Sequence, residues 1–415
     1  MFRLAASLLL AGGLCLTPIA LAQLELQAQL VVPLVGASPN DIAFGDFDGD
    51  GDLDLALVNR DDLLANLLVL NNNGSGGFSR GHSALLGTTT TSRAFAIIAA
   101  DLNGDNNLDL AVALLGSDQV AVLLGAGDGT FGAASLFTTG NAPGDIATGE
   151  FQAGNGLDLI TVDTEANTTS VLLNDGTGTF GAAITNDVGR DPSKVGVGDF
   201  DGDGNLDICT SIGDEDKVDI QLGMGDGTFG AITSVTVGRD PWAVATADFN
   251  GDGFTDIAVT NATEDTVSIL TGDGMGGFAV TGTFATGNAP KGIAIMDMDG
   301  DGNLDIVTSN EESDNVSILA GGGDGTFGSP SDFDTGNEAI DLVVADFNGD
   351  NTPDIATVNR IDGTVSVVLS GAAPPPVIPP ITDIGGICPL AMFTMISLTL
   401  TGLVRSRPRR ARVGR

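Results

Sequence analysis

A unit of 49 residues recurs through the middle of this 415-residue chain and restricts its fold more than any other feature. Each unit carries an acidic loop, and successive loops are separated by 55 residues once and then by 49 residues five times. A Gly-rich turn ending in Phe follows 30 residues after the loop start in five copies and 32 residues after it in the first. The seven loops begin at Asp46, Asp101, Glu150, Asp199, Asp248, Asp297 and Asp346. So regular a spacing indicates repeated units that bury their apolar faces against one another.

Within one unit, short apolar runs alternate with turns, which predicts four strands. In the fifth copy we place these strands at 243–248, 256–260, 266–271 and 278–286. Ile, Val or Leu stands four residues before every loop, and Leu or Ile stands one residue after it. We expect these side chains to pack between neighbouring units. Seven four-stranded units predict an all-β, seven-bladed β-propeller over residues 23–371.

The phase of the repeat predicts how the ring closes. The Phe of the Gly-rich turn lies 19 residues before each loop in copies three to seven. Counting back from Asp46 therefore places a strand at about 27–34, in the register of a fourth strand. The seventh copy's own fourth strand would fall in a Pro-rich segment. We expect the N-terminal strand to complete the last blade, so that the ring has no unpaired edge.

The acidic loops have the composition of metal sites. The first follows the pattern D-x-D-x-D-G-x-x-D, with side-chain oxygens at positions 1, 3, 5 and 9 and Gly at position 6 for a sharp turn. An all-oxygen cage in an exported chain favours Ca²⁺ over Mg²⁺. We predict Ca²⁺ in six loops. The predicted ligands are Asp46, Asp48, Asp50 and Asp54; Asp101, Asn103, Asp105 and Asp109; Asp199, Asp201, Asp203 and Asp207; Asp248, Asn250, Asp252 and Asp256; Asp297, Asp299, Asp301 and Asp305; and Asp346, Asn348, Asp350 and Asp354.

The third loop departs from this pattern. Glu150, Gln152, Gly154 and Asp158 occupy positions 1, 3, 5 and 9, which leaves one Asp in place. We expect this loop to be empty or to bind metal weakly.

The loops, the Gly-Asp-Gly-Thr-Phe turns at 127–131, 225–229 and 323–327, and the Gly-Asn-Ala-Pro segments at 140–143 and 287–290 resemble FG-GAP/VCBS repeats. These repeats form the integrin-α-like propeller family, and the resemblance covers roughly residues 27–371. It implies calcium on the face that bears the acidic loops and ligand contacts on the opposite face. The family includes adhesion receptors, and related propellers occur beside or within polysaccharide-acting enzymes.

The amino-acid composition argues against two classes of function, nucleic-acid binding and catalysis. The formal net charge of −39 argues against nucleic acid as a partner, because phosphate contacts need clustered Lys and Arg. With one His, one Trp and no Tyr, the chain offers no convincing catalytic set, and we assign no catalytic residue. The alternative is an enzyme that cleaves glycans with paired carboxylates, such as Asp191 and Asp240.

Basic residues point to one face of the propeller. Nine lie between residues 23 and 371, and eight of them fall on or beside the connections opposite the metal loops. Either cations are merely excluded from the calcium loops, or they form a surface that contacts an anion or a glycan. The second alternative predicts a protein or glycan ligand. Its candidate contacts are Arg60, Arg190, Arg239, Trp242, Lys291 and Arg360.

The two ends of the chain have the composition of targeting segments. Residues 1–22 have the charge, apolar run and Ala-Leu-Ala end of a secretory signal peptide. A Pro-rich linker at 372–383 precedes an uncharged segment at 384–404, long enough for a transmembrane or sorting helix, and an Arg-rich tail at 405–415. By the positive-inside rule the tail stays cytoplasmic. We expect an exported, surface-anchored and monomeric propeller; retention of the tail and its cleavage by a sorting enzyme both remain open.

Overall fold

A computed structural model of the chain describes residues 29–34, 38–60, 66–86 and 92–371. All of these belong to the first of two compact units, 1–373 and 374–415. The predicted signal peptide, Pro-rich linker, C-terminal helix and Arg-rich tail lie outside the described residues. Within the described ranges, no helix combines the length and apolarity that crossing a bilayer requires.

The described residues form seven antiparallel sheets of four strands, which we call blades one to seven. Blade one is β2 (Pro39–Gly45), β3 (Asp54–Asn59), β4 (Leu67–Asn71) and β5 (Ser79–Ala84); blade two is β6 (Ala94–Ala100), β7 (Asp109–Leu114), β8 (Gln119–Leu123) and β9 (Ser135–Thr138); blade three is β10 (Pro143–Gly149), β11 (Asp158–Asp163), β12 (Thr168–Leu172) and β13 (Ile184–Asp187); blade four is β14 (Pro192–Gly198), β15 (Asp207–Ile212), β16 (Lys217–Gln221) and β17 (Thr233–Thr236). Blade five is β18 (Pro241–Ala247), β19 (Asp256–Asn261), β20 (Thr266–Gly272) and β21 (Phe278–Ala285); blade six is β22 (Pro290–Met296), β23 (Asp305–Asn310), β24 (Asn315–Leu319) and β25 (Ser331–Asp334); blade seven is β26 (Ala339–Ala345), β27 (Asp354–Asn359), β28 (Thr364–Val368) and β1 (Gln29–Pro33). A short 3-10 turn, Gly213–Glu215, joins β15 to β16.

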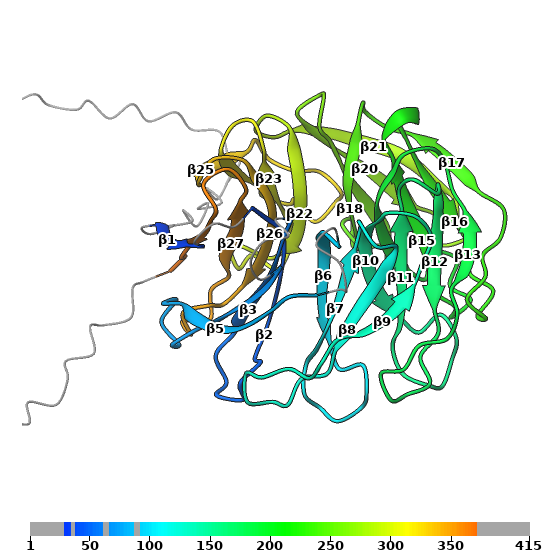
Figure 1. Cartoon of the computed structure of the whole chain (residues 1–415). Helices are drawn as coiled ribbons and strands as arrows, with labels where there is room; N and C mark the ends of the chain where they lie inside the picture. Colours follow the sequence, from blue (N-terminus) through cyan, green and yellow to red (C-terminus); the bar gives the residue numbers. More distant parts are fainter. Residues whose placement is uncertain (1–28, 35–37, 61–65, 87–91, 372–415) are drawn as a thin grey trace, which may run out of the picture. The chain divides into compact units, whose positions relative to one another are not determined.

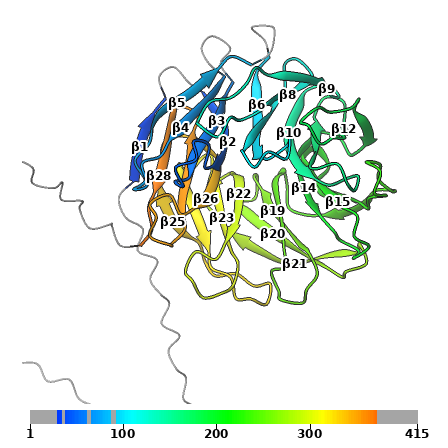
Figure 2. The same ribbon diagram turned by 90° about the horizontal axis from the view of Figure 1, so that it is seen from below.

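The first strand of every blade contacts the first strands of both neighbouring blades, so these seven strands surround a common axis. In Figure 1 the sheets follow one another in chain order from blue to orange. Figure 2 shows β2, β10 and β14 toward the middle of the ring, with β5, β9 and β21 toward its outside. This arrangement confirms the seven-bladed propeller that the 49-residue spacing predicts.

The N-terminal strand closes the ring as the phase of the repeat predicts. β1 pairs antiparallel with β28, which places it outermost in the sheet that otherwise contains β26 to β28. The backbone N–H of Leu34 adds a hydrogen bond of 2.8 Å to the carbonyl oxygen of Gly363. Blade seven therefore unites the two ends of the described chain.

The core lies between blades. The residue that follows each loop is fully buried in all seven copies, from Leu55 to Ile355. The clusters join neighbours: Leu55 and Leu57 pack with Val365 and Val367 of blade seven. On the crowded first strand of blade four, a Cβ at Gly196 would lie 2.7 Å from Cys209 Sγ, so the packing leaves no room for a side chain there. The predicted blade-on-blade packing is confirmed.

Candidate functional site

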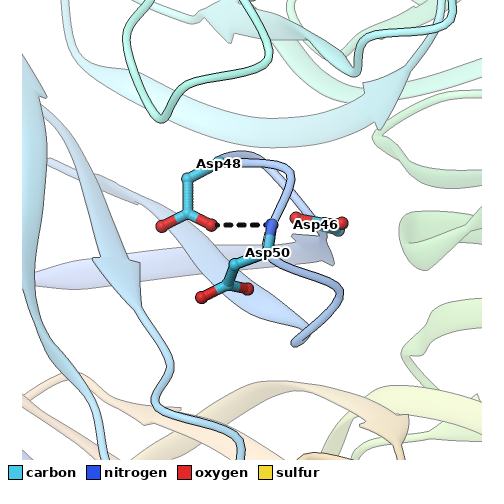
Figure 3. A group of neighbouring side chains, drawn as sticks. All are labelled: Asp46, Asp48 and Asp50. Atoms are coloured by element: carbon cyan, nitrogen blue, oxygen red, sulfur yellow. Dashed lines mark hydrogen bonds between the residues drawn. The ribbon is translucent and has the colours of Figure 1, made fainter.

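The acidic loops gather carboxylates at one face of the propeller. Three groups have carboxylate oxygens within 4.8 Å of one another and could hold a metal ion. These groups are Asp46, Asp48 and Asp50; Asp199, Asp201 and Asp203; and Asp297, Asp299 and Asp305. Figure 3 shows the first of them, in which the Asp50 N–H donates to Asp48 Oδ1 over 3.3 Å. Hard oxygen ligands at this density suit a divalent cation.

Each loop holds its carboxylates with its own backbone. Asp46 accepts hydrogen bonds from the N–H groups of Gly49 at 2.7 Å and Gly51 at 3.1 Å. Both glycines have positive φ, 77° and 94°, a conformation that side-chain-bearing residues rarely adopt. The sharp turn expected at position 6 is therefore present. The loop's own backbone therefore holds its carboxylates close together.

Three predicted sites contain Asn at position 3, and within the described residues their carboxylates form no group of three. The loop hydrogen bonds are nevertheless repeated, because Asp248 accepts from Gly251 at 2.7 Å and Asp346 accepts from Gly349 at 2.7 Å. In the second loop, Asn103 Nδ2 donates to Asp105 Oδ2 over 3.2 Å. Amide oxygens at these positions would have to complete the cage.

The Asp at position 9 has a role that the sequence pattern did not reveal. In six blades one of its oxygens accepts the N–H of loop position 2, and in blade three it accepts the N–H of position 3, Gln152, over 2.6–3.1 Å in all seven. The other oxygen accepts a backbone N–H at or just after the end of the third strand over 2.7–2.9 Å. This carboxylate joins the two connections of one blade. Burial, reinforced by Asp48 and Asp50, raises the pKa of Asp54 to about 6, although two backbone hydrogen bonds oppose the rise.

Neighbouring blades are joined at the same face. The N–H of Gly129, in the Gly-rich turn of blade two, donates to the carbonyl of Phe47 in the loop of blade one over 2.8 Å. Beside this bond the rings of Phe47 and Phe131 meet edge to face, with centroids 5.8 Å apart. Four other blade pairs repeat the contact. The Phe that recurs at loop position 2 is the feature of the sequence that could have predicted this contact between blades. The acidic loops therefore take part directly in the interfaces between blades.

The opposite face contains a cavity of about 290 Å³ at the axis. Each first strand has a register shift near its start, as between Pro39 and Asp41. A bulge turns a side chain out of the regular alternation. Residues at these shifts line the cavity, namely Asn40, Phe95, Trp242, Lys291 and Ile340. The residues just after three second strands complete the wall, namely Arg60, Glu311 and Arg360.

The charges of the cavity wall are mostly paired. Arg360 forms ion pairs with Glu311 and, at 2.7 Å, with Glu338. The Arg60 guanidinium lies 5.2 Å from the centroid of the Phe95 ring. Lys291 Nζ lies over the Trp242 ring, 3.6 Å from its centroid. This face of Trp242 is therefore covered by an ammonium group.

Deeper along the axis, Lys194 and Asp341 also line the cavity. Lys194 Nζ lies 3.0 Å from Asp145 Oδ1. Burial lowers the pKa of Lys194, but the carboxylates of Asp145, Asp41 and Asp341 outweigh it and raise the pKa overall. Burial and the adjacent Asp41 raise the pKa of Asp341. These four residues occupy the same position in their first strands, which a comparison at 49-residue spacing would have found.

The structure brings together four of the six candidate ligand contacts, Arg60, Trp242, Lys291 and Arg360. The remaining two do not line the cavity. Arg239 has a side chain 64% exposed and pairs with Glu264 at 3.2 Å. Arg190 is exposed, and its backbone N–H donates to Glu215 Oε1. The positions of the basic residues in the sequence therefore did not identify the cavity. The prediction missed six of the lining residues, namely Asn40, Phe95, Lys194, Glu311, Ile340 and Asp341.

Comparison with known proteins identifies the family. The FG-GAP-like repeat matches residues 46–112, 155–210, 209–259, 248–308 and 297–357, which is more than half of the chain. The chain belongs to the FG-GAP-like repeat family. No curated protein matches the sequence.

Solved structures show the same fold at low identity. Virginiamycin B lyase from Staphylococcus aureus is 11% identical with a TM-score of 0.58, over 83% of this chain and 100% of its own. A lectin from Agrocybe aegerita, solved to explain its recognition of non-reducing terminal N-acetylglucosamine, is 18% identical with a TM-score of 0.51, over 78% and 86%. The periplasmic gluconolactonase of Pseudomonas aeruginosa is 15% identical with a TM-score of 0.54, over 72% and 86%.

Proposed function

We propose that this FG-GAP-like repeat protein is an exported, surface-anchored, calcium-binding propeller that acts as a non-catalytic adhesion or ligand-binding module. Its metal loops stabilise the ring, and its ligand binds at the axial cavity of the opposite face. The composition of residues 1–22 and 384–415 supports export and anchoring. The regular Asp loops support calcium, with six sites and a weak or empty third loop.

One observation carries the choice of ligand site. Residues from distant repeats, including Arg60, Trp242, Lys291 and Arg360, line a single cavity on the axis. Its wall combines paired charges with an amide and two aromatic rings, each of which holds a cation over one face, and the polar groups of such a wall exchange hydrogen bonds with hydroxyls. A cavity of about 290 Å³ is at the lower end of small-ligand sites. The ligand that fits these properties is a terminal sugar residue of a glycan.

A binding panel of glycans of defined structure, with the full calcium-loaded chain, tests the proposal. The double variant Arg60→Ala/Lys291→Ala removes two cavity cations, and Arg190→Ala/Arg239→Ala removes two cations outside the cavity as a matched control. We expect the first variant to lose about tenfold or more in affinity and the second to bind like the wild type. Equal binding by both variants would place the ligand elsewhere. If no glycan binds, a protein ligand is the remaining alternative.

A second candidate, glycan cleavage, is favoured by one arrangement. A methyl group on Gly213 would lie 3.4 Å from Asp191 Oδ2 and 3.5 Å from Asp240 Oδ1, so the two carboxylates flank one backbone position. Burial, followed by repulsion from Asp214 and Asp240, raises the pKa of Asp191, as a proton donor requires. Incubation of the same glycan panel with the protein, followed by product analysis, distinguishes the candidates. Product formation that Asp191→Asn abolishes would establish the enzyme.

A further inference from the structure

Lys291 differs from the other amine of the cavity in what surrounds its charge. The nearest carboxylate oxygen, Asp240 Oδ2, lies 4.0 Å from Lys291 Nζ, which is beyond hydrogen-bonding distance. The side chain is 14% exposed, and the ammonium lies against the Trp242 ring. Lys194, by contrast, has Asp145 at 3.0 Å.

This environment leaves the Lys291 ammonium incompletely satisfied. An ammonium group has three N–H donors, and no acceptor lies within hydrogen-bonding distance of Lys291 Nζ among the residues that the structure describes. The Trp242 ring attracts the charge and fixes its place, but it accepts no conventional hydrogen bond. Burial, which outweighs the attraction of Asp240 and Glu311, lowers the pKa of Lys291. An acceptor supplied by a ligand would complete the group.

We infer that the cavity selects a hydroxylated ligand that carries a single carboxylate, a sugar acid, and that Lys291 is the residue that binds the carboxylate. This inference rests on the proposed function and names the class of its ligand. The carboxylate would accept N–H donors from Lys291, while ligand hydroxyls donate to Glu311 and Asp341 in the same wall.

The wall holds both signs of charge. Arg360 is paired with Glu311 and Glu338, and Lys194 is paired with Asp145. Lys291, whose closest carboxylate oxygen lies 4.0 Å away, and Arg60, which lies over the Phe95 ring, are the other cations of the wall. A single carboxylate on the ligand would therefore find in Lys291 an ammonium group without a close carboxylate partner.

Calorimetric titration with matched sugar pairs tests the inference. The pairs are the methyl glycosides of glucuronic, galacturonic and mannuronic acid and of the corresponding neutral hexoses. For the full calcium-loaded chain, we expect at least one sugar acid to bind about tenfold or more tightly than its neutral partner, because a hydrogen bond to a charged group is stronger than a neutral one. Lys291→Met keeps the apolar stem and should reduce the preference to about one, while Lys291→Arg should restore part of it.

A matched control is Arg239→Met, which removes a cation outside the cavity and should leave the preference unchanged. If no sugar acid binds better than its neutral partner, or if Lys291→Met keeps the preference, the inference is wrong. Neutral sugars that bind the wild type and fail to bind Arg60→Ala/Lys291→Ala would then still support the proposed function. The two failures are therefore distinguishable.

Discussion

The acidic loops of blades three and four join strands that are alike, but the two loops differ in the side chains that could bind a metal. In blade four, Asp199, Asp201 and Asp203 converge and could hold an ion, whereas Glu150 and Gln152 leave blade three without such a group among the described residues. The strands are nonetheless alike, since β11 and β15 each have six residues and are buried throughout.

What the two loops share is the Asp at position 9. Asp158 accepts backbone N–H groups of Gln152 at 2.9 Å and Asn174 at 2.8 Å. Asp207 accepts a similar pair, from Phe200 at 2.6 Å and Gly223 at 2.7 Å, although Phe200 lies one position earlier in its loop than Gln152 does. The comparison teaches that the Asp at position 9 supports the blade in both copies, whereas only the loop of blade four adds carboxylates that could hold a metal. Blade three has the Asp at position 9 but no Asp at positions 1, 3 and 5.

Removal of calcium should have the largest effect. A site saturated about 100-fold above its dissociation constant adds roughly 2.7 kcal/mol to the free energy of unfolding, and several sites act together. Excess chelator should therefore lower the melting temperature by many degrees, and added calcium should restore it. Differential scanning calorimetry measures this shift. An unchanged melting temperature would mean that the loops are not calcium sites.

Loss of the position 9 carboxylate should have the second largest effect, and the decrease in the free energy of unfolding should be equal in the two blades. Asp207→Ala and Asp158→Ala each leave one buried and one partly buried N–H group without an acceptor, and a buried unsatisfied donor costs about 1–3 kcal/mol. Denaturant unfolding in chelator measures the loss without metal. Asp203→Ala, at an exposed loop position, is the control and should cost far less. If Asp158→Ala left the free energy of unfolding unchanged, that result would contradict the structural role assigned to this residue.

Rebuilding the third loop should have a smaller effect of opposite sign. Glu150→Asp, Gln152→Asp, Ala153→Gly, Gly154→Asp and Asn155→Gly together give it the pattern of the fourth loop. We expect the calcium stoichiometry to rise by one and the free energy of unfolding to rise by up to roughly 2.7 kcal/mol at about 100-fold saturation. Equilibrium dialysis counts the ions. An unchanged count would show that blade three lacks more than ligands.

The dependence on pH should be the smallest effect and should reverse with calcium. Burial raises the pKa of Asp54 and Asp354 to about 6 in the metal-free fold, above the ordinary Asp value of 3.8. The folded state then binds protons more tightly than the unfolded state, so this contribution is present below pH 4 and is lost as pH rises through 6. In chelator, stability should rise on acidification from pH 7 to pH 5.

With saturating calcium, acidification should instead reduce stability, because protons compete with the ion for the carboxylates. Denaturant midpoints at both pH values, with and without calcium, give the sign in each case. The same direction in both conditions would contradict the assignment of these loops to metal. Asp54→Asn in chelator should remove part of the dependence and serves as the control.

Much of the fold could be predicted because it depends on local chemistry repeated at a fixed period. The strands of blade five were predicted within about two residues of β18 to β21. The strand expected at 27–34 is found as β1, Gln29–Pro33, paired with β28. The carboxylates of each group lie within one nine-residue loop, so their convergence follows from the pattern and its glycines.

The cavity could not be predicted because its members are far apart in sequence. Arg60, Lys291 and Arg360 come from blades one, six and seven, and only the closed ring places them around one axis. Arg190 and Arg239 share their composition but not their position, so charge alone could not separate them.

The sequence by itself determined the repeat, the number of blades, the closure and the loops that could bind metal, because each of these depends on residues in register along the chain. Only the tertiary structure decided that Asp at position 9 joins two connections, that Phe47 meets Phe131 across a blade interface, and that Lys291 lies over Trp242. The last two contacts join residues of different blades, tens of positions apart, and the distances between them are set by how the blades pack and by how each first strand bulges.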